Sequence, residues 1–231
     1  MTILAIEFSS TRRSVTVLDQ PTVPNEPRVV QVVAETQRET RSAAMVRDVL
    51  AMAHLAPRQI SKLAVGLGPG SYAGIRHALA FLQGWQLAFP IPLVGVASSK
   101  IIAWQLQASG QRGSIGVIID ALRQEYCMET YELSENEVSL TAPLHLVSHQ
   151  TLSDQCASGL PVAGPVPADQ SPPGAMVMFP DATTLAERAL HEEGTSQAET
   201  MAPIYLRKAT FVMAPPPRTW DTTKGNSSGS V

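Results

Sequence analysis

The spacing of hydrophobic and polar positions predicts an alternation of strands and helices in the first half of the chain. The apolar run 2–8 predicts a buried strand, and the alternating segment 13–18 and the valine-rich segment 28–34 predict two more. The following segments predict a helix (42–55), a strand (62–67), a helix (73–88), a strand (93–96) and a helix that Ser98 caps and that ends at Gln107. The predicted order is therefore β-β-β-α-β-α-β-α.

A shorter and partly repeated pattern follows residue 110. It predicts strands at 115–119, 125–133 and 175–179 and a helix at 181–193, with a Pro/Gly-rich stretch at 159–174 between them. We therefore expect an α/β protein with the two-lobed, ribonuclease-H-like fold of the actin-like ATPases (the ASKHA class) and a reduced C-terminal lobe. The expected lobes are 1–110 and 111–210, and the Ser/Gly/Thr-rich tail 211–231 is predicted to be disordered.

Charge and cysteine content narrow the class of protein. The net charge is −3 and no run of Lys or Arg forms a basic stripe, which argues against an autonomous nucleic-acid binder. The two cysteines, Cys127 and Cys156, predict neither a disulfide framework nor a zinc knuckle, so a reducing compartment fits best. No apolar run approaches the roughly 18 residues of a membrane span, and the N-terminus lacks the basic region of a signal peptide. We expect a cytoplasmic protein.

The segment GLGPGSYAGIR, from Gly66 to Arg76, is the most informative local feature, and it predicts a strand that turns through glycines into a helix. Free N–H groups at such a helix start favour an anion. That interpretation makes the following residues anion contacts: Gly68, Gly70, Ser71, Gly74 and Arg76. The nucleotide motifs fit poorly, because no Lys follows Gly74 and Ala73 stands where a Rossmann motif needs glycine. A tight turn with close packing is the other interpretation.

The two long helices of the first lobe are more apolar than a small domain requires. A helix that is apolar almost all round is buried on more than one side. The surplus predicts a protein–protein surface, although a thick core beneath the second half would also account for it. The candidate interface residues are Met45, Val49, Met52, Ile75, Leu79, Phe81 and Leu82.

The sequence offers no convincing catalytic set. His145 and His149 have the spacing of a zinc-ligand pair, but no Glu lies between them and the preceding Pro143 predicts a strand or loop. Glu7 and Asp120, each at the end of a predicted strand, are the carboxylates best placed to face a cleft. We therefore predict no catalytic residues and no metal site in this chain.

Five motifs in order along residues 1–210 resemble the TsaB (YeaZ) family of tRNA threonylcarbamoyladenosine biosynthesis proteins. They are ILAI-acid-x-S (3–9), GxGPGSxxGxR (66–76), PxxGVxS (92–98), Asp-Ala-x-x-x-Glu-x-Tyr (matched by Asp120, Ala121, Glu125 and Tyr126), and A-x-P-x-Y-L-R in 201–207. Two departures stand out: Glu7 replaces the usual Asp, and 39–42 lacks the usual His.

The resemblance implies a two-lobed actin-like fold and a non-catalytic role. Such a protein forms a heterodimer with the TsaD-type transferase, which a TsaE-type ATPase joins. It meets tRNA only through that complex, and ATP and a metal belong to the partner subunits. The transferase's metal-binding His pair aligns with Ser98 and Ile102 here, and neither can serve as a His.

Two alternative functions and one expectation about self-association accompany this hypothesis. The first alternative is an M22-type metallopeptidase-like hydrolase, because the family resembles that group. The second is an independent ATPase or kinase of the same fold, which Glu7 and the missing Lys disfavour. The exposed apolar helices also predict a homodimer when the partner is absent.

Overall fold

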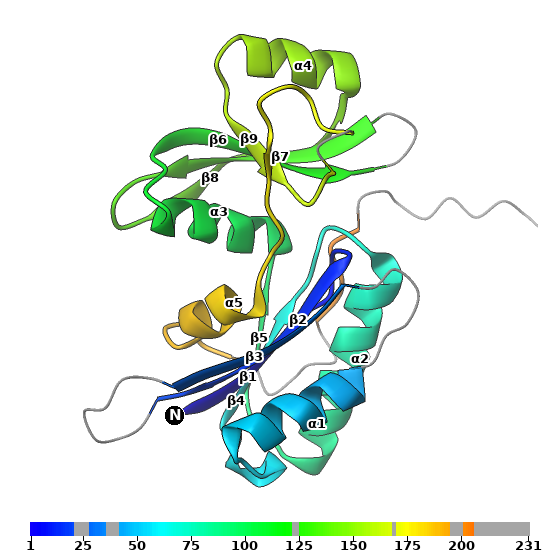
Figure 1. Cartoon of the computed structure of the whole chain (residues 1–231), viewed down its shortest axis with the longest axis vertical. Coiled ribbons are helices and arrows are strands. Elements are labelled where there is room, and N and C mark those ends of the chain that lie inside the picture. Colours follow the sequence, from blue (N-terminus) through cyan, green and yellow to red (C-terminus); the bar gives the residue numbers. More distant parts are fainter. Residues whose placement is uncertain (21–27, 36–41, 122–124, 168–169, 195–200, 206–231) are drawn as a thin grey trace, which may run out of the picture.

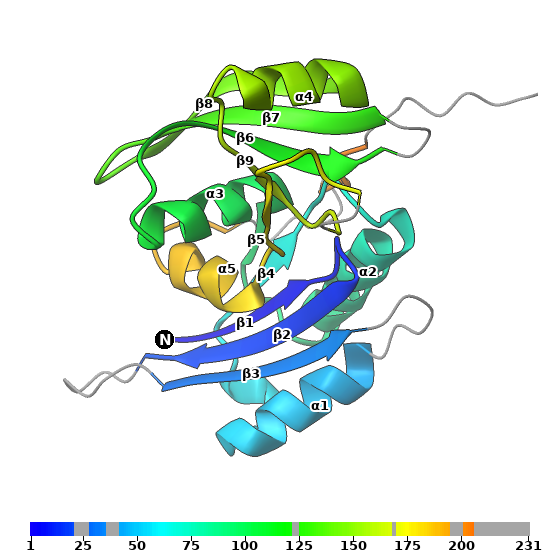
Figure 2. The same ribbon diagram turned by 45° about the horizontal axis from the view of Figure 1, so that its top comes forward.

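Two five-stranded sheets stacked between helices make up the molecule. The computed structural model describes residues 1–20, 28–35, 42–121, 125–167, 170–194 and 201–205. Seen from the side in Figure 2, the layers run helix, sheet, helix pair, sheet, helix pair, with α3 (Ser98–Ala108) and α5 (Ala182–Ala189) between the two sheets. Figure 1 shows the two sheets as separate lobes with these helices at the waist.

The first sheet has the strand order β3-β2-β1-β4-β5. Its strands are β1 (Thr2–Glu7), β2 (Arg12–Asp19), β3 (Arg28–Glu35), β4 (Lys62–Gly66) and β5 (Leu93–Val96). The first three are antiparallel, and β4 and β5 run parallel to β1 because helices connect them. The connecting helices are α1 (Ser42–Ala53) and α2 (Tyr72–Ala88), with a short 3-10 helix (Pro57–Gln59) before β4. The predicted element order of this half is confirmed.

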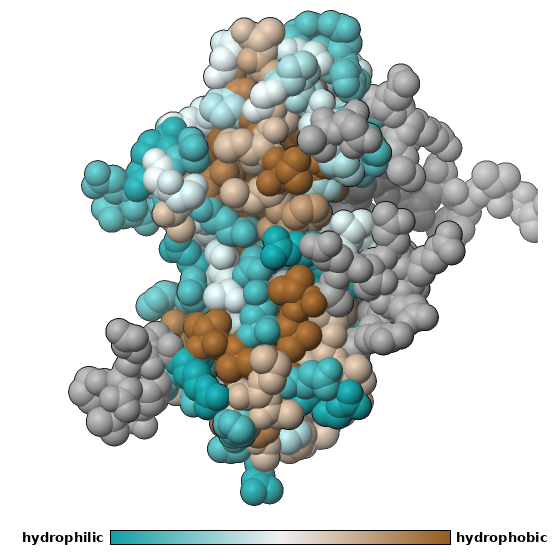
Figure 3. Space-filling model, in the orientation of Figure 1, coloured by the Kyte–Doolittle hydropathy of each residue, from teal (hydrophilic) through white to brown (hydrophobic). Residues whose placement is uncertain are grey.

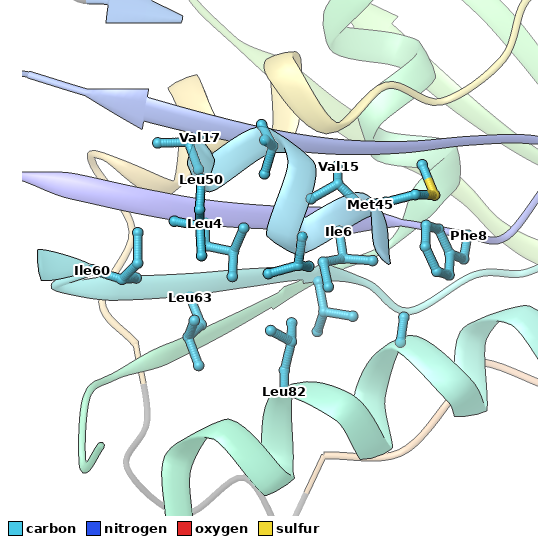
Figure 4. Packing of buried hydrophobic residues seen from close by; sticks show 14 of the residues in the cluster. Leu4, Ile6, Phe8, Val15, Val17, Met45, Leu50, Ile60, Leu63 and Leu82 are labelled. Atoms are coloured by element: carbon cyan, nitrogen blue, oxygen red, sulfur yellow. The ribbon is translucent and has the colours of Figure 1, made fainter. Parts of the chain in front are cut away.

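Helices α1 and α2 cover one face of the first sheet and form its larger core. Alternate residues of β1 and β2, such as Leu4 and Val15, point into this layer and meet Met45 and Leu82 from the helices (Figure 4). Five of the predicted interface residues are therefore buried in the folded chain and form no surface. These are Met45, Val49, Ile75, Leu79 and Leu82. The prediction is corrected for them because the sheet, rather than a partner, absorbs most of the apolar surplus.

The second sheet repeats the topology of the first. Its strand order is β10-β9-β6-β7-β8, which, read from the β8 edge, matches the first sheet strand for strand. The strands are β6 (Gly113–Asp120), β7 (Glu125–Leu133), β8 (Val138–Ser148), β9 (Val162–Gly164) and β10 (Met176–Val177), and α4 (His149–Ala157) covers the outer face. Three of these elements, β8, α4 and β9, were not predicted. Pro143 lies inside β8, where it is tolerated because β8 is the edge strand.

The last helix of each half packs on the sheet of the other half. Helix α3 follows the first sheet in the chain, yet Ile102 and Leu106 pack with Ile115 and Val117 of the second sheet. Helix α5 follows the second sheet, yet its buried face packs on β1, β2 and β4 of the first. A chain boundary at residue 110 therefore does not separate two self-contained cores. The predicted tail, 211–231, lies outside the described residues.

The hydrophobic surface is uneven. Figure 3 shows hydrophobic residues gathered over the first sheet, where the edge strand β3 carries the exposed side chains of Val29 and Val33.

In the described part of the chain, no helix combines the length and apolar character that crossing a membrane requires.

Candidate functional site

The glycine-rich turn between β4 and α2, within the segment 66–76 (the signature turn), closes over a buried carboxyl group at the end of β1. Ile6 pairs with Val65, so Glu7 lies beside Gly66 on the neighbouring strand. A Cβ added at Gly66 would lie 1.7 Å from Glu7 Oε2, which means that the Glu7 side chain fits only over a glycine. The side chain is fully buried. Glu7 therefore does not face a cleft, and that part of the prediction is wrong.

Hydrogen bonds hold the Glu7 carboxyl from both sides. The Ser9 backbone N–H donates to Oε1 over 2.7 Å, and the Ser98 hydroxyl donates to Oε2 over 2.9 Å. Ser98 Oγ in turn accepts from the Gly68 N–H over 3.0 Å. Burial raises the pKa of Glu7, and the hydrogen bonds from Ser9 and Ser98 act in the opposite direction. The prediction that Ser98 caps α3 is wrong: Ala97 is the N-cap residue, and the Ser98 hydroxyl instead donates to Glu7.

The backbone donors of the turn are used inside the protein. The Ser71 N–H donates to the Ser9 carbonyl over 2.6 Å, and the Gly74 N–H donates to Ser71 Oγ over 3.3 Å. Together with the Gly68–Ser98 bond, this occupies three of the donors that the anion interpretation needs. The anion interpretation is therefore corrected for Gly68, Ser71 and Gly74. The turn is a packing element whose donors lock α2 and α3 onto β1.

Close approach explains the glycines of the turn. Gly68 has φ +87°, which disfavours a side chain. Cβ atoms at Gly70 and Gly74 would lie 2.2 Å from the Ser9 carbonyl oxygen and 2.1 Å from that of Phe8. The start of α2 therefore rests directly on the backbone that follows β1.

A cavity of about 470 Å³ lies between the lobes in front of this turn. Asp120, at the exposed end of β6, lines it, as predicted for a cleft carboxylate. Glu7 does not line it, so the two carboxylates do not meet. Gly70 and Ser71, two of the residues proposed as anion contacts, also line it. The remaining polar lining was not predicted and comes mainly from the loop after β1: Ser9, Ser10, Thr11, Arg13 and Gln170. A cluster of small hydroxyl residues between two strands was the available signal.

The two histidines with the spacing of a zinc-ligand pair are engaged in other contacts. His145 lies in β8, with its Nδ1 2.8 Å from the Pro143 carbonyl oxygen. His149 is the first residue of α4, and its ring lies against the ring of Tyr126 in β7. Within the described ranges, no three His, Cys, Asp or Glu side chains gather as metal ligands would. Ile102, one of the two positions aligned with the transferase's His pair, is fully buried in the core beneath the second sheet.

A polar cluster joins α3 to the second sheet. The Ser99 hydroxyl donates to Glu129 Oε2 and lies 3.1 Å from the Tyr131 hydroxyl, which itself donates to the same carboxylate over 2.9 Å. Burial raises the pKa of Tyr131, the neighbouring Ser99 hydroxyl opposes this shift, and the charge of Glu129 adds to it. All three side chains are buried, so the cluster holds the waist of the molecule and offers no surface to a substrate.

The outer face of α1 and α2 keeps two of the predicted interface residues at the surface. Met52 is 54% exposed and Phe81 is half-buried. Exposed small residues accompany them on α2, namely Ala80 and Gly84. A Cβ added at Gly84 would meet nothing within 4 Å. The two helices therefore leave exposed apolar positions on this side of the molecule, beside the exposed Arg47–Asp48 ion pair of α1.

Comparison with known proteins identifies relatives. The family model for tRNA N6-adenosine threonylcarbamoyltransferase (TsaD) matches residues 29–163. The tRNA threonylcarbamoyladenosine biosynthesis protein TsaB of Bacillus subtilis (strain 168) is 28% identical over 62% of this chain and 60% of its own length. TsaB of Escherichia coli (strain K12) is also 28% identical, over 60% of this chain and 58% of its own length. The chain thus spans about 60% of the length of the curated relatives it matches.

Solved structures agree over a longer range. YeaZ from Pseudomonas aeruginosa superposes with a TM-score of 0.70 at 25% identity, covering 89% of this chain and 99% of that one. A Pseudomonas aeruginosa protein described as similar to peptidase YEAZ gives a TM-score of 0.72 at the same identity and coverage. The predicted resemblance to TsaB (YeaZ) and the predicted two-lobed fold class are confirmed.

Proposed function

The chain belongs to the family of the tRNA N6-adenosine threonylcarbamoyltransferase TsaD, and on this premise we propose that it is the TsaB-like, non-catalytic partner of a TsaD-type transferase. In this role it binds and stabilises the transferase, in the cytoplasm, while threonylcarbamoyladenosine forms beside the tRNA anticodon. A TsaE-type ATPase completes the assembly. The chain itself holds no cofactor; ATP and the metal belong to the partner subunits.

The observation that carries this proposal is the use of the two positions aligned with the transferase's metal ligands. The Ser98 hydroxyl donates to Glu7 and accepts from the Gly68 N–H, and Ile102 is packed between α3 and the second sheet. Neither offers an atom to a metal, and the chemistry of both side chains is wrong for one. Both positions contribute to the fold, which supports a role without transferase or metallopeptidase chemistry in this chain.

The open face of α1 and α2 is the surface we propose for the transferase. Ala80 and Gly84 lie one turn apart on α2, so a partner helix can approach the backbone closely there. Met52 on α1 adds a flexible apolar side chain that adapts to a partner surface, and Phe81 adds an aromatic one. The same face would pair two copies of the chain when the transferase is absent.

Co-purification with the cognate transferase tests the proposal. We expect Met52→Glu and Gly84→Glu each to abolish co-purification, because a charge at the centre of an apolar interface is buried without a partner. Leu140→Glu is the matched control: Leu140 is 51% exposed, but it lies on β8 in the other lobe. Retention of the complex by both helix variants would show that the partner binds elsewhere.

Purified chain separates this proposal from the metallopeptidase-like alternative. We expect metal analysis of the chain to give no stoichiometric metal and a peptidase assay to give no cleavage, and calorimetry with ATP to show no binding. Stoichiometric zinc together with peptide cleavage that a chelator abolishes would favour the hydrolase instead.

A further inference from the structure

Two exposed tyrosines stand side by side next to the signature turn. Tyr72 is the first residue of α2, and Tyr205 is the last residue of the described segment 201–205. Their ring centroids are 5.6 Å apart with planes tilted by 39°, and each side chain is about half exposed. Neither ring belongs to a core cluster of the fold. Aromatic rings held in this way at a surface are suited to stacking against another flat group.

A small cavity opens at the foot of the two rings. Its volume is about 220 Å³, which is below the range of sites that enclose a whole drug-sized ligand and matches a single ring system. Its other walls are uncharged: Gly70, Ile75, Ala121, Pro203 and Ile204. The Ile204 N–H donates to the Leu67 carbonyl over 2.8 Å, so the segment that carries Tyr205 is fixed to the end of β4. The cavity is therefore built by two anchored elements.

Positive charge accompanies the rings. The Arg76 guanidinium donates to the Tyr72 hydroxyl over 2.6 Å and lies 5.1 Å from the centroid of the same ring. An aromatic pair beside a cation matches the two parts of a nucleotide, a flat base and a phosphate.

We propose that Tyr72, Tyr205 and Arg76 form a stacking site for one unpaired base of an RNA strand. The inference rests on the proposed function, which brings tRNA to the assembly. The base stacks on the exposed tyrosine faces at the mouth of the cavity, and the Arg76 guanidinium lies next to its phosphate. One base contact fits the net charge of −3, because the chain then adds to RNA that the partner holds.

The test measures the affinity of the complex of the full chain with its cognate transferase for fluorescein-labelled tRNA, by fluorescence anisotropy. We expect Tyr72→Leu and Tyr205→Leu each to weaken binding about five-fold or more. Tyr205→Phe, which keeps the ring, should bind as the unaltered chain does, and so should the Leu140→Ala control. Arg76→Gln should reduce the salt dependence of binding, because one phosphate contact is lost.

Three results would overturn the inference. The first is unchanged tRNA affinity in both leucine variants. The second is loss of co-purification with the transferase in those variants, which would make the tyrosines a protein contact. The third is displacement of tRNA by AMP as efficient as displacement by unlabelled tRNA, which would assign the site to a free nucleotide.

A second measurement separates this inference from the proposed function. The isolated full chain is titrated with a labelled RNA hairpin that has an unpaired loop, and with a fully paired RNA of the same length. Preference for the loop that both leucine variants lose supports the stacking site even if the transferase does not bind this chain. Equal binding of the two RNAs contradicts it.

Discussion

At the scale of single residues, the most constrained group in the protein is the Glu7 carboxyl. It is fully buried, it packs on the backbone of Gly66, and it accepts hydrogen bonds from Ser9 and Ser98. A buried carboxyl group favours its neutral form, and the pKa of Glu7 is accordingly raised. The folded state therefore binds a proton here more readily than the unfolded state does.

This difference predicts a pH-dependent stability that Glu7→Gln removes. Below the pKa of an unfolded Glu, about 4.3, Glu7 is neutral in both states and its contribution is fully present. As the pH rises through the folded pKa, that contribution is lost, so the chain should lose stability relative to Glu7→Gln. Urea unfolding of both proteins from acid to neutral pH measures this, and a difference that stays constant with pH would contradict it.

The glycines of α2 provide a paired prediction. Gly74→Ala should destabilise the fold by about 1–3 kcal/mol, because the added Cβ meets the carbonyl oxygen of Phe8 and the helix must shift. Gly84→Ala on the same helix should instead stabilise it by about 1 kcal/mol, because its Cβ meets nothing and alanine favours a helix. Thermal unfolding of both variants gives the comparison. Equal effects would show that helix propensity, not close approach, governs the turn.

At the scale of elements, helix α5 is a short helix that depends on its anchors. At its start, the Ala182 N–H donates to Ser14 Oγ over 2.9 Å, and Asp181 accepts from the Gln31 side chain over 2.7 Å. At its last residue and just beyond, the Lys62 ammonium group donates to the carbonyls of Ala189 and Glu192 over 2.8 and 2.9 Å. A helix of this length is marginal by itself, so these bonds and its apolar face hold it on the first sheet.

Lys62→Met tests this anchoring. It should destabilise the chain by about 1–3 kcal/mol, because it leaves two carbonyl groups near the end of α5 without their donor and removes a favourable charge from a helix C-terminus. The control Arg58→Met, at an exposed position of the 3-10 helix, should have little effect. Amide hydrogen exchange should localise the loss to α5, and exchange that is faster throughout the molecule would contradict the anchoring role.

How far the sequence predicts an element depends on its environment. The strands and helices of the first lobe follow from long apolar runs, since both of their faces are buried or one face is clearly apolar. Helix α4 buries only Leu152, and β8 is an edge strand with Pro143 in it, so neither shows a strong periodic pattern. The roles of Ser98 and Glu7 depend on contacts between residues 91 positions apart, which no local pattern contains.

At the scale of the whole molecule, the two lobes exchange their last helices. The buried face of β1, with Ile3 and Ala5, is completed only when α5 arrives from the far end of the second half. Likewise Ile102 of α3 completes the second core. The resemblance to a two-lobed fold predicted two lobes but not this exchange. The local hydrophobic pattern of a helix shows that one face is buried, but not which of the two sheets it packs against.

Expression of residues 1–110 alone should therefore give a chain that does not unfold cooperatively. Without α5, the apolar face formed by β1 and β4, including Ile3 and Ala64, is exposed to water. Urea unfolding of the fragment and of the full chain, monitored by near-ultraviolet circular dichroism, measures the loss of cooperativity. A sharp transition in the fragment would show that the first lobe is self-sufficient.

The exchange of helices also sets an order of events during synthesis. Strands β1 and β4 and helices α1 and α2 are made first, but their second face stays bare until residues 182–189 have been added. At the usual rates of translation that interval is on the order of ten seconds. A half-covered sheet with an apolar edge strand is a substrate for chaperones during that time. The nascent chain should therefore stay bound to chaperones until late in its synthesis, and its release from them should coincide with the docking of α5.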